Sequence, residues 1–572
     1  MNTTGLRDTL SQLDWTDSRL ADDLLAGLHL VGDLPWTGLW EQKRSLSAAI
    51  TKDALINQAK QLRHELIESS QAKALPAHQR HVRKTLWEQT KEDIRAGIIG
   101  KPRKASAPAE RIHKPLTRRF GREQFSSKGQ KKIRCIDDFS ASLINSAVGV
   151  PETLHHEHVD DLAQLLEKLG TRGHRPQLLK ADFHKAYRSV PVHPDDSPLA
   201  DILVYDTDNC RWVIAQQRAL PFGAVAAVYG WERVGSALTG IIRQRIGIPF
   251  LRYVDDLFTA LPPMLAQQAR VSLEEILDCL GFALAPEKTE GPSDSLTILG
   301  VQVVIEDKQA RFFPEPAKAA RWITDIKAAL NDNSLSPGEA NKLAGRLNFA
   351  SSTTFGRVGM AHIRPLYHRA HGRRGSSGRK LYQLHLDTPI KKALRWWLHL
   401  LQHRHLEATV HFTRQHTDTH ILYTDATGDG HLGSALYDTE ARCLGWSAGQ
   451  TPQWMHHRLH KRKTQINAHE LIAAHWGLED FSDTIRGSTV HLYVDNTAAE
   501  HIARKGSSKS ADLNQIAGSL WLLAAELHIH LHLHRVPSKS NPSDAPSRGT
   551  TPPLASEDLR HHGIRCRIKL RW

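Results

Sequence analysis

The spacing of hydrophobic and polar residues separates helical segments from segments that mix helices and strands. In residues 1–98, apolar positions such as Leu55, Leu62 and Leu66 recur at the spacing of amphipathic helices. From about 130 to 305, short apolar runs typical of strands alternate with helical spacing, which predicts an α+β or α/β arrangement. The expected strands lie at 177–181, 202–205, 251–254 and 296–305.

The pattern becomes helical again after Pro314. Pro316 favours a helix that runs to Ala329, and residues 336–339 have the Ser-x-x-Glu form of a capping box, with proline at the first helical position. Apolar residues then repeat at helical spacing from Ala340 to Ala350, so we expect a pair of helices. Residues 371–380, rich in glycine, arginine and serine, predict a loop or linker.

These changes of pattern divide the chain into several parts. A chain of 572 residues, 40% hydrophobic and 24% charged, is long enough to bury more than one core. The expected parts are a helical amino-terminal extension (1–98), a basic linker (99–130), a mixed block (131–305), a helical segment (306–405), a second mixed block (409–549) and a basic tail (550–572).

Composition excludes several classes of protein. No apolar run reaches the roughly 18 residues of a membrane span, and the first 25 residues carry five aspartates without an apolar stretch, which argues against a secretory signal. The five cysteines are scattered without a Cys-x-x-Cys pair, which excludes a disulfide framework and a cysteine-based zinc site. We therefore expect an intracellular protein, in the cytoplasm or the nucleus, without a membrane partner.

The basic charge is concentrated in one region. The whole chain has a formal net charge of +14, and twelve Lys or Arg against two Glu lie between Lys101 and Arg134. Such a block suits a polyanion, because phosphates neutralised by Lys and Arg release counterions. A solvated, flexible linker is the alternative, supported by three prolines in the same stretch, and both interpretations are compatible.

A first group of carboxylates consists of Asp182, Asp255 and Asp256. Residues 178–182 form an apolar strand that ends in a carboxylate, and residues 252–258 predict a hairpin with two adjacent aspartates at its turn. Clustered carboxylates repel one another unless cations lie between them, and hard oxygen ligands suit Mg²⁺. Two metal ions can activate an attacking hydroxyl and stabilise a leaving phosphate oxygen. An ordinary acidic surface turn is the alternative.

Four strings in this block resemble, in order, the motifs of the reverse transcriptase palm: Lys180 to Tyr187, Leu220 to Gly223, the Tyr-Val-Asp-Asp of 253–256, and Leu299-Gly300-Val301. The resemblance runs from about Arg134 to Val304. It implies that Asp182 and Asp255 are metal ligands and that Asp256 is the second carboxylate of the Tyr-x-Asp-Asp turn.

The same resemblance implies roles for four further residues. Arg134 would contact the incoming triphosphate, and Tyr187 would crowd a 2′-hydroxyl and favour dNTPs. Gly223 would permit close backbone approach near the nascent base pair, and Lys288 would protonate pyrophosphate. A core aromatic is the alternative for Tyr187, and a solvated surface lysine is the alternative for Lys288.

A second group of acids consists of Asp425, Glu470, Asp495 and Asp544. Residues 421–425 and 490–495 each predict a strand that ends in an aspartate, and the two aspartates would converge if neighbouring strands end together. Glu470 lies near the start of a helix expected over 467–478. A reciprocal cap with Asn467 is an alternative role for it.

These acids lie in strings that resemble the four acidic motifs of type 1 ribonuclease H, over about 409–549. The resemblance implies that the four carboxylates hold two Mg²⁺ ions that activate water against RNA in an RNA/DNA hybrid. A histidine often precedes the last aspartate in this family, whereas Arg535 stands here, with His534 beside it. The alternating histidines of 528–534 predict a strand with Ile529, Leu531 and Leu533 inward, rather than a metal site.

Together the two resemblances imply a retrotransposon reverse transcriptase, and residues 342–350 and 543–548 look closest to enzymes of the DIRS type or a related one. The implied fold is a right-hand polymerase of fingers and palm (131–305) and thumb or connection (306–405), followed by a ribonuclease H-like mixed β-sheet with flanking helices. The implied cofactors are two Mg²⁺ per active site, with Mn²⁺ as an alternative, and the partners are RNA template, DNA primer, RNA/DNA hybrid and dNTPs. The competing hypotheses are a catalytically retired nucleic-acid-binding protein and a chain in which only the ribonuclease half is active.

Overall fold

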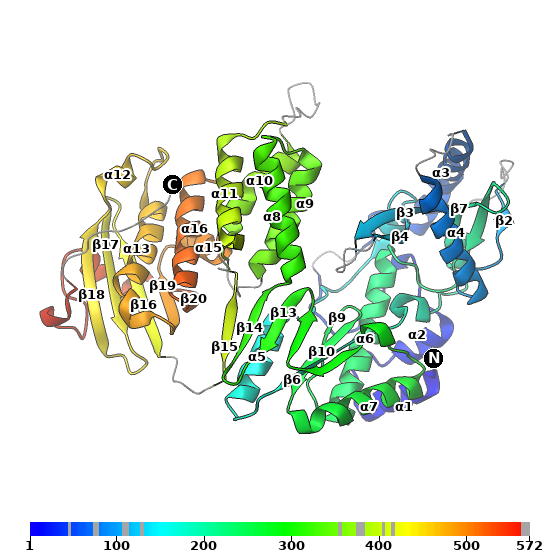
Figure 1. The fold of residues 1–572 in the computed structure, drawn as a ribbon, viewed down its shortest axis with the longest axis horizontal. Coiled ribbons are helices and arrows are strands. Elements are labelled where there is room, and N and C mark those ends of the chain that lie inside the picture. The colour runs from blue at the N-terminus through cyan, green and yellow to red at the C-terminus, as the bar shows by residue number, and fades with distance from the viewer. Residues whose placement is uncertain are drawn as a thin grey trace. The chain divides into compact units, whose positions relative to one another are not determined.

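The computed structural model describes residues 1–43, 47–72, 79–105, 114–125, 131–352, 357–372, 384–402, 406–412 and 418–561. The chain forms two compact units. The first comprises residues 1–169 and 174–299, and the second comprises residues 170–173 and 300–572. Each unit combines helices with β-sheets (Figure 1), which confirms the predicted mixed α and β multidomain class.

Sheet A of the first unit contains the hairpin with the paired aspartates. Strand β10 runs antiparallel to β6 on one side and to β9 on the other, and β11 pairs with the far edge of β6. The strands predicted at 177–181 and 251–254 are confirmed, to within one residue at one end. The strands of sheet A, in spatial order, are β11 (Glu290–Ser293), β6 (Gln177–Asp182), β10 (Asp256–Leu261) and β9 (Leu251–Tyr253).

Sheet B of the first unit draws two of its strands from the segment predicted as a basic linker. Strand β3 pairs with β4 and β7, and β2 pairs with β8. The described part of 99–130 is therefore partly sheet, and Arg119 of β3 is buried with its guanidinium bonded to Asp137 of β4. Residues 106–113 and 126–130 lie outside the described residues. In spatial order the strands are β2 (Arg103–Lys104), β8 (Arg211–Gln216), β7 (Asp201–Asp206), β3 (Thr117–Phe125) and β4 (Lys131–Asp137).

The helices of the first unit include the predicted amino-terminal ones. Leu6, Leu10 and Leu24 are buried in the same core as Trp231 and Leu238 of the long helix α6, so the start of the chain completes that core. Helix α6 ends where Gly247 takes a left-handed conformation. The helices are α1 (Thr3–Gln12), α2 (Leu20–Ala26), α3 (Lys52–Ala72), α4 (Arg80–Arg95), α5 (Val159–Gly170), α6 (Val225–Ile246) and α7 (Pro263–Leu280).

The second unit begins with a small sheet, sheet C, and four helices. The predicted capping box is confirmed, because the Ser336 amide donates to Glu339 Oε2 at 2.8 Å and the Glu339 amide donates to Ser336 Oγ at 3.2 Å. The strand predicted at 296–305 is divided into β12 (Ser295–Ile298) and β13 by Leu299 and Gly300, which both have positive φ. The elements are β13 (Val301–Ile305), β14 (Gln309–Pro314), β15 (Ala408–His411), α8 (Pro316–Asn331), α9 (Pro337–Ser352), α10 (Met360–His371) and α11 (Thr388–Gln402).

Sheet D of the second unit has five strands, and its strands β16, β19 and β20 run parallel. Helices α13 and α16 pack into a core with the inward residues of these strands. In spatial order the strands are β18 (Cys443–Gln450), β17 (His431–Tyr437), β16 (Thr419–Ala426), β19 (Thr489–Val494) and β20 (His530–Arg535). The helices are α12 (Gln453–His456), α13 (Ile466–Asp480), α14 (Ser482–Ile485), α15 (Thr497–Lys505), α16 (Ala511–Glu526) and α17 (Asp544–Ser547).

Some predicted features fall on residues that are not described. They are the greater part of the loop at 371–380, the end of the helical segment at 403–405, and the tail beyond 561. Among the helices of the described residues, none combines the length and the apolar character needed to cross a membrane.

Candidate active sites

The first group of carboxylates lies at one end of sheet A. Asp256 is the register partner of both Asp182 on β6 and Tyr253 on β9, and Asp255 occupies the turn between β9 and β10. The Phe183 amide donates to the Asp255 carbonyl at 3.0 Å, which ties the turn to the end of β6. The antiparallel pairing therefore brings the three predicted acids to the same end of the sheet.

Burial and the mutual repulsion of the acids shift pKa values at this end of sheet A. Burial and the charge of Asp182 raise the pKa of Asp255, and burial with the charges of Asp255 and Asp182 raises the pKa of Asp256 to about 6. Lys288 Nζ lies 2.6 Å from Asp182 Oδ1. Burial by itself lowers the pKa of Lys288, but its hydrogen bond to Asp182 and the charges of the three aspartates outweigh burial and raise it. Lys288 thus balances part of the negative charge.

The turn that carries Asp255 has an unusual backbone. Val254 has a φ of +54°, which is rare for a β-branched residue. Its carbonyl accepts hydrogen bonds from Trp231 Nε1 at 3.0 Å and from Arg252 Nη1 at 2.7 Å. Arg252 Nη2 also donates to Glu232 Oε2 at 2.6 Å, and both side chains of this ion pair are buried. The buried ion pair of Arg252 with Glu232 therefore fixes the turn through the hydrogen bond from Arg252 to the Val254 carbonyl.

Sequence reasoning missed Glu232 and Arg252 as contributors to this site. Glu232 lies among apolar residues of helix α6, and a charged residue in such a helix was the available signal, because a buried charge requires a partner. Nothing in the local sequence identified that partner as Arg252.

The residues predicted to bind nucleotide are distributed around sheets A and B. Arg134 is an exposed residue of β4. The Tyr187 ring contacts Phe222 edge-on with centroids 6.1 Å apart, and burial followed by the charges of Glu232 and Asp255 raises the pKa of its hydroxyl. Tyr187 also packs against the core of the first unit, so the alternative role of a core aromatic describes part of its environment.

Gly223 meets a strict steric requirement. Its φ is +104°, and a Cβ built there would lie 2.8 Å from the Asp137 carbonyl oxygen. Its own carbonyl accepts a hydrogen bond from Asn145 Nδ2 at 3.0 Å. A side chain at this position would require the backbone to move.

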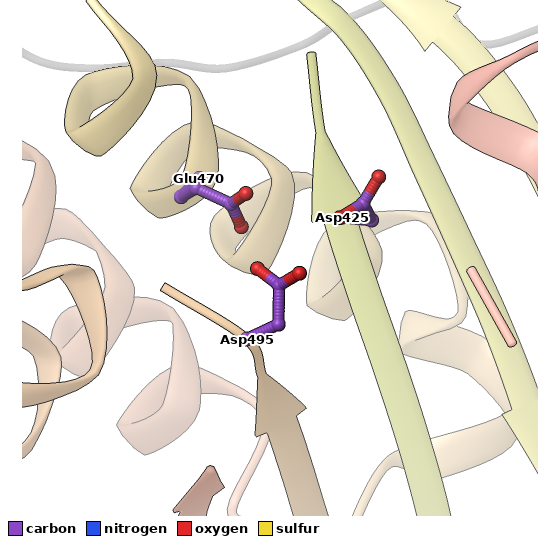
Figure 2. Close-up of side chains that lie close together, drawn as sticks. All are labelled: Asp425, Glu470 and Asp495. Carbon is purple, nitrogen blue, oxygen red and sulfur yellow. The ribbon is translucent and has the colours of Figure 1, made fainter. Parts of the chain in front are cut away.

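The second group of acids lies where parallel strands of sheet D end. Asp425 stands near the end of β16, Asp495 directly follows β19, and Glu470 lies on α13. Figure 2 shows their carboxylates turned toward one another, and one ligand atom from each lies within 4.8 Å of the others. Helix α13 begins at Ile466 with Gln465 as its N-cap, so Glu470 lies too far along the helix to form the reciprocal cap with Asn467.

The donor set of this group suits a divalent cation. Burial and the charges of Asp425 and Asp495 raise the pKa of Glu470 to about 9, and burial, with the charge of Asp495, raises the pKa of Asp425 to about 6. Glu470 Oε1 accepts a hydrogen bond from the Ala426 amide at 3.3 Å, whereas its buried Oε2 has no hydrogen-bond partner. An orphaned carboxylate oxygen among hard oxygen donors fits Mg²⁺ or a similar ion.

Asp544 lies on α17 and is not a member of this close group. Its Oδ1 accepts a hydrogen bond from Arg548 at 2.9 Å, and the side chain is 46% exposed. Two neighbours of Asp544 connect its segment to β16, because Ser547 Oγ donates to Asp425 Oδ2 at 2.5 Å and Asn541 Nδ2 donates to the Thr424 carbonyl at 3.1 Å. The structure thus places Asp544 beside the group and three of the four predicted acids within it.

The histidines of 528–534 lie as the alternating pattern predicts. Ile529, Leu531 and Leu533 pack against the core, while the imidazoles of β20 face away from it. His534 stacks on Tyr493 with centroids 4.9 Å apart, and its Nε2 lies 2.9 Å from His491 Nδ1. His534 is therefore engaged with residues of β19, and Arg535 is the register partner of Val494.

Comparison with known proteins shows a similarity over part of the chain. A family model described as reverse transcriptase (RNA-dependent DNA polymerase) matches residues 128–303. No curated protein matches the chain significantly. The structure of foamy viral protease-reverse transcriptase in complex with an RNA/DNA hybrid is 12% identical with a TM-score of 0.44, and the match covers 93% of this chain and 61% of that chain.

Two further structures of the foamy viral protein are similar. Its complex with double-stranded DNA is 13% identical with a TM-score of 0.42, covering 93% of this chain and 94% of that chain. A form designated dRH, also with double-stranded DNA, is 14% identical with a TM-score of 0.44, covering 92% and 78%. The segment 128–303, which contains Asp182, Asp255 and Asp256, is thus similar to reverse transcriptases.

Proposed function

We propose that this chain is an RNA-directed DNA polymerase that also hydrolyses the RNA strand of RNA/DNA hybrids. The observation that carries the proposal is the meeting of Asp182, Asp255 and Asp256 at one end of sheet A, inside the segment that matches the reverse transcriptase family. The acids of sheet D, at the ends of parallel strands, support the hydrolytic activity. The substrates are dNTPs, an RNA template and a DNA primer.

Asp182 and Asp255 would hold divalent cations at the polymerase site, and Asp425, Glu470 and Asp495, with Asp544 beside them, would hold them at the hydrolytic site. When bound, such cations activate the attacking oxygen and neutralise charge on the phosphate. Mg²⁺ is the expected ion at both sites, and Mn²⁺ is an alternative.

The residues around sheet A have separate tasks in nucleotide addition. The Arg134 guanidinium offers paired donors to a triphosphate, and Lys288 Nζ carries a proton that it can give to the departing pyrophosphate. Tyr187 would crowd the sugar of an incoming nucleotide and so favour one that lacks a 2′-hydroxyl. The buried Glu232 and Arg252 pair keeps the Asp255 turn in place during this step.

We further propose a retroelement enzyme of the DIRS type or a related one, acting inside the cell, because residues 342–350 and 543–548 resemble segments of such enzymes. In such an element the polymerase copies RNA into DNA, and the hydrolytic site removes the copied strand. Selection of RNA paired with DNA would depend on the 2′-hydroxyl and on the shape of the hybrid.

Primer extension tests the polymerase half. Purified protein given a primed RNA template, dNTPs and Mg²⁺ should extend the primer, and Asp255→Asn should abolish extension while hybrid cleavage continues. Asp495→Asn is the matched variant, because it should abolish cleavage and leave extension intact. Extension by Asp255→Asn at the wild-type rate would refute the assignment of the polymerase site.

The same assays separate the competing functions. Cleavage without extension by the wild-type protein would indicate that only the ribonuclease half is active. Binding of hybrid without either reaction, at any Mg²⁺ or Mn²⁺ concentration, would indicate a retired enzyme that retains nucleic-acid binding.

A further inference from the structure

A strongly basic loop leads into helix α13. The basic loop, residues 456–463, contains Arg458, Lys461, Arg462 and Lys463 together with three histidines. No Asp or Glu occurs in the chain between Glu440 and Glu470. The function proposed above does not explain this concentration of positive charge.

The basic loop is fixed to the second unit by buried contacts. Leu459 of the loop and Met455, which precedes it, are buried in the core of sheet D. Arg462 Nη2 lies 2.5 Å from Asp512 Oδ1, and the His460 amide donates to Asp512 Oδ2 at 2.9 Å. Because Asp512 is itself buried, these bonds hold the loop backbone in one position. A charged loop that served only solubility would need no such anchor.

The loop lies at the end of sheet D that carries the acids. The His456 ring at its start is 5.0 Å from the ring of His469, the residue before Glu470. His469 Nδ1 in turn lies 3.2 Å from the carbonyl oxygen of Thr427, two residues after Asp425. This series of contacts connects the basic loop to both elements that supply the acids.

The other three cations of the loop lie at the protein surface. Arg458, Lys461 and Lys463 are exposed. The Arg458 guanidinium lies 5.6 Å from the centre of the Trp454 ring, and Trp454 is 41% exposed. An arginine beside an exposed aromatic ring can contact the phosphate backbone of a nucleic acid, and the ring can stack on its bases.

We propose that the basic loop binds the phosphate backbone of the nucleic-acid duplex that the Asp425, Glu470 and Asp495 group cleaves. The acids repel a polyanionic strand, and fixed cations beside them offset that repulsion. The proposal rests on the hydrolytic part of the proposed function, and it identifies the surface that holds the substrate.

The test compares two double variants of the full chain. Lys461→Gln/Lys463→Gln removes two exposed charges from the loop. Arg442→Gln/Arg486→Gln removes two from the opposite end of sheet D, since Arg442 follows the turn after β17 and Arg486 precedes β19. A third variant, Lys461→Arg/Lys463→Arg, keeps the charge. Thermal melting should show all three folded as the wild type.

Hydrolysis of an RNA/DNA hybrid is measured across a range of salt concentrations. The loop variant should raise KM about tenfold with kcat within twofold of wild type. It should also reduce the slope of log(kcat/KM) against log salt by about 1 to 2, since each lost phosphate contact removes about 0.9 of slope on B-form DNA. The control and the Arg-retaining variants should match the wild type. Primer extension in the same preparations should be unchanged.

Hybrid binding by these variants in an Asp495→Asn background separates the two proposals. Wild-type cleavage with unchanged KM and slope in the loop variant would overturn the loop assignment and leave the hydrolytic function intact. Absence of cleavage in the wild type, with a reduced binding slope in the loop variant, would overturn the hydrolytic function and retain the loop as a duplex-binding surface. An equal loss in the control variant would also overturn the loop assignment.

Discussion

Replacement of Arg252 by methionine tests whether the buried ion pair beneath the Asp255 turn supports catalysis. The Arg252 guanidinium donates at 2.7 Å to the Val254 carbonyl and at 2.6 Å to Glu232. A hydrogen bond from a charged donor contributes about 1.5–3 kcal/mol. If this bond is needed in the transition state, its loss should slow primer extension about 10- to 150-fold, because 1.36 kcal/mol corresponds to a factor of ten.

The same replacement also leaves Glu232 buried without its partner. Breaking a buried pair in this way costs about 3–5 kcal/mol of folding free energy, so loss of extension alone would be ambiguous. Arg233→Met provides the control, because Arg233 is the next residue of helix α6 and is also buried, with Nε 2.8 Å from Asp17 Oδ2 and Nη2 2.7 Å from Asp23 Oδ2. Arg233 faces the amino-terminal segment and has no hydrogen bond to the turn.

The assay is single-turnover extension at a temperature well below the melting transition of both variants. Arg252→Met should extend slowly and Arg233→Met at close to the wild-type rate, although both unfold at lower denaturant concentrations than the wild type. The double variant Glu232→Gln/Arg252→Met should recover much of the stability and little of the rate. Equal rates for Arg252→Met and Arg233→Met would refute the positioning role.

Three further outcomes are expected. Gly223→Ala should destabilise the first unit by about 1–3 kcal/mol in denaturant titrations, because its φ is +104° and the new Cβ would meet the Asp137 carbonyl at 2.8 Å. Tyr187→Val should raise incorporation of rNTPs relative to dNTPs in competition assays, and an unchanged ratio would remove the steric role. The pKa of about 9 for Glu470 means that the folded, metal-free protein binds a proton which the unfolded chain releases near pH 4.5. Its stability contribution is thus present at low pH and lost as the pH rises through 9, so calorimetry in EDTA should show this trend in the wild type and not in Glu470→Gln.

The positions of the acids could be predicted because they depend on local pattern. Alternating residues in 490–495 set which face of the strand is buried, and the parallel pairing of β16 with β19 brings Asp425 and Asp495 to the same end. The two roles left open for Glu470 depended on where helix α13 starts. The N-cap lies at Gln465, two residues before Asn467, which removes the reciprocal cap, and sequence patterns do not fix helix ends so closely.

Two features could not be predicted, for a different reason. They are the ion pair that supports the Asp255 turn and the strands in the basic segment. Glu232 and Arg252 are 20 residues apart and meet only after α6 has packed on sheet A. The basic residues of β3 suggested solvent exposure, but Arg119 is buried because Asp137 of β4 supplies a bidentate partner at 2.8 and 2.9 Å. Local sequence patterns cannot predict that a charged residue is buried when its partner is distant in sequence.

The two acid groups differ in how their charge is balanced, and this difference sets how each should depend on cations. At sheet A, Lys288 forms an ion pair with Asp182 at 2.6 Å, and the most raised pKa there, that of Asp256, is about 6. At sheet D, Asp425, Glu470 and Asp495 form no ion pair with Lys or Arg in the described part of the chain, and Glu470 reaches about 9. The second group must release a proton from Glu470 at neutral pH before that carboxylate can act as a ligand. Its affinity for divalent cations should therefore fall more steeply with decreasing pH than that of the first group, so that hybrid cleavage is lost before primer extension.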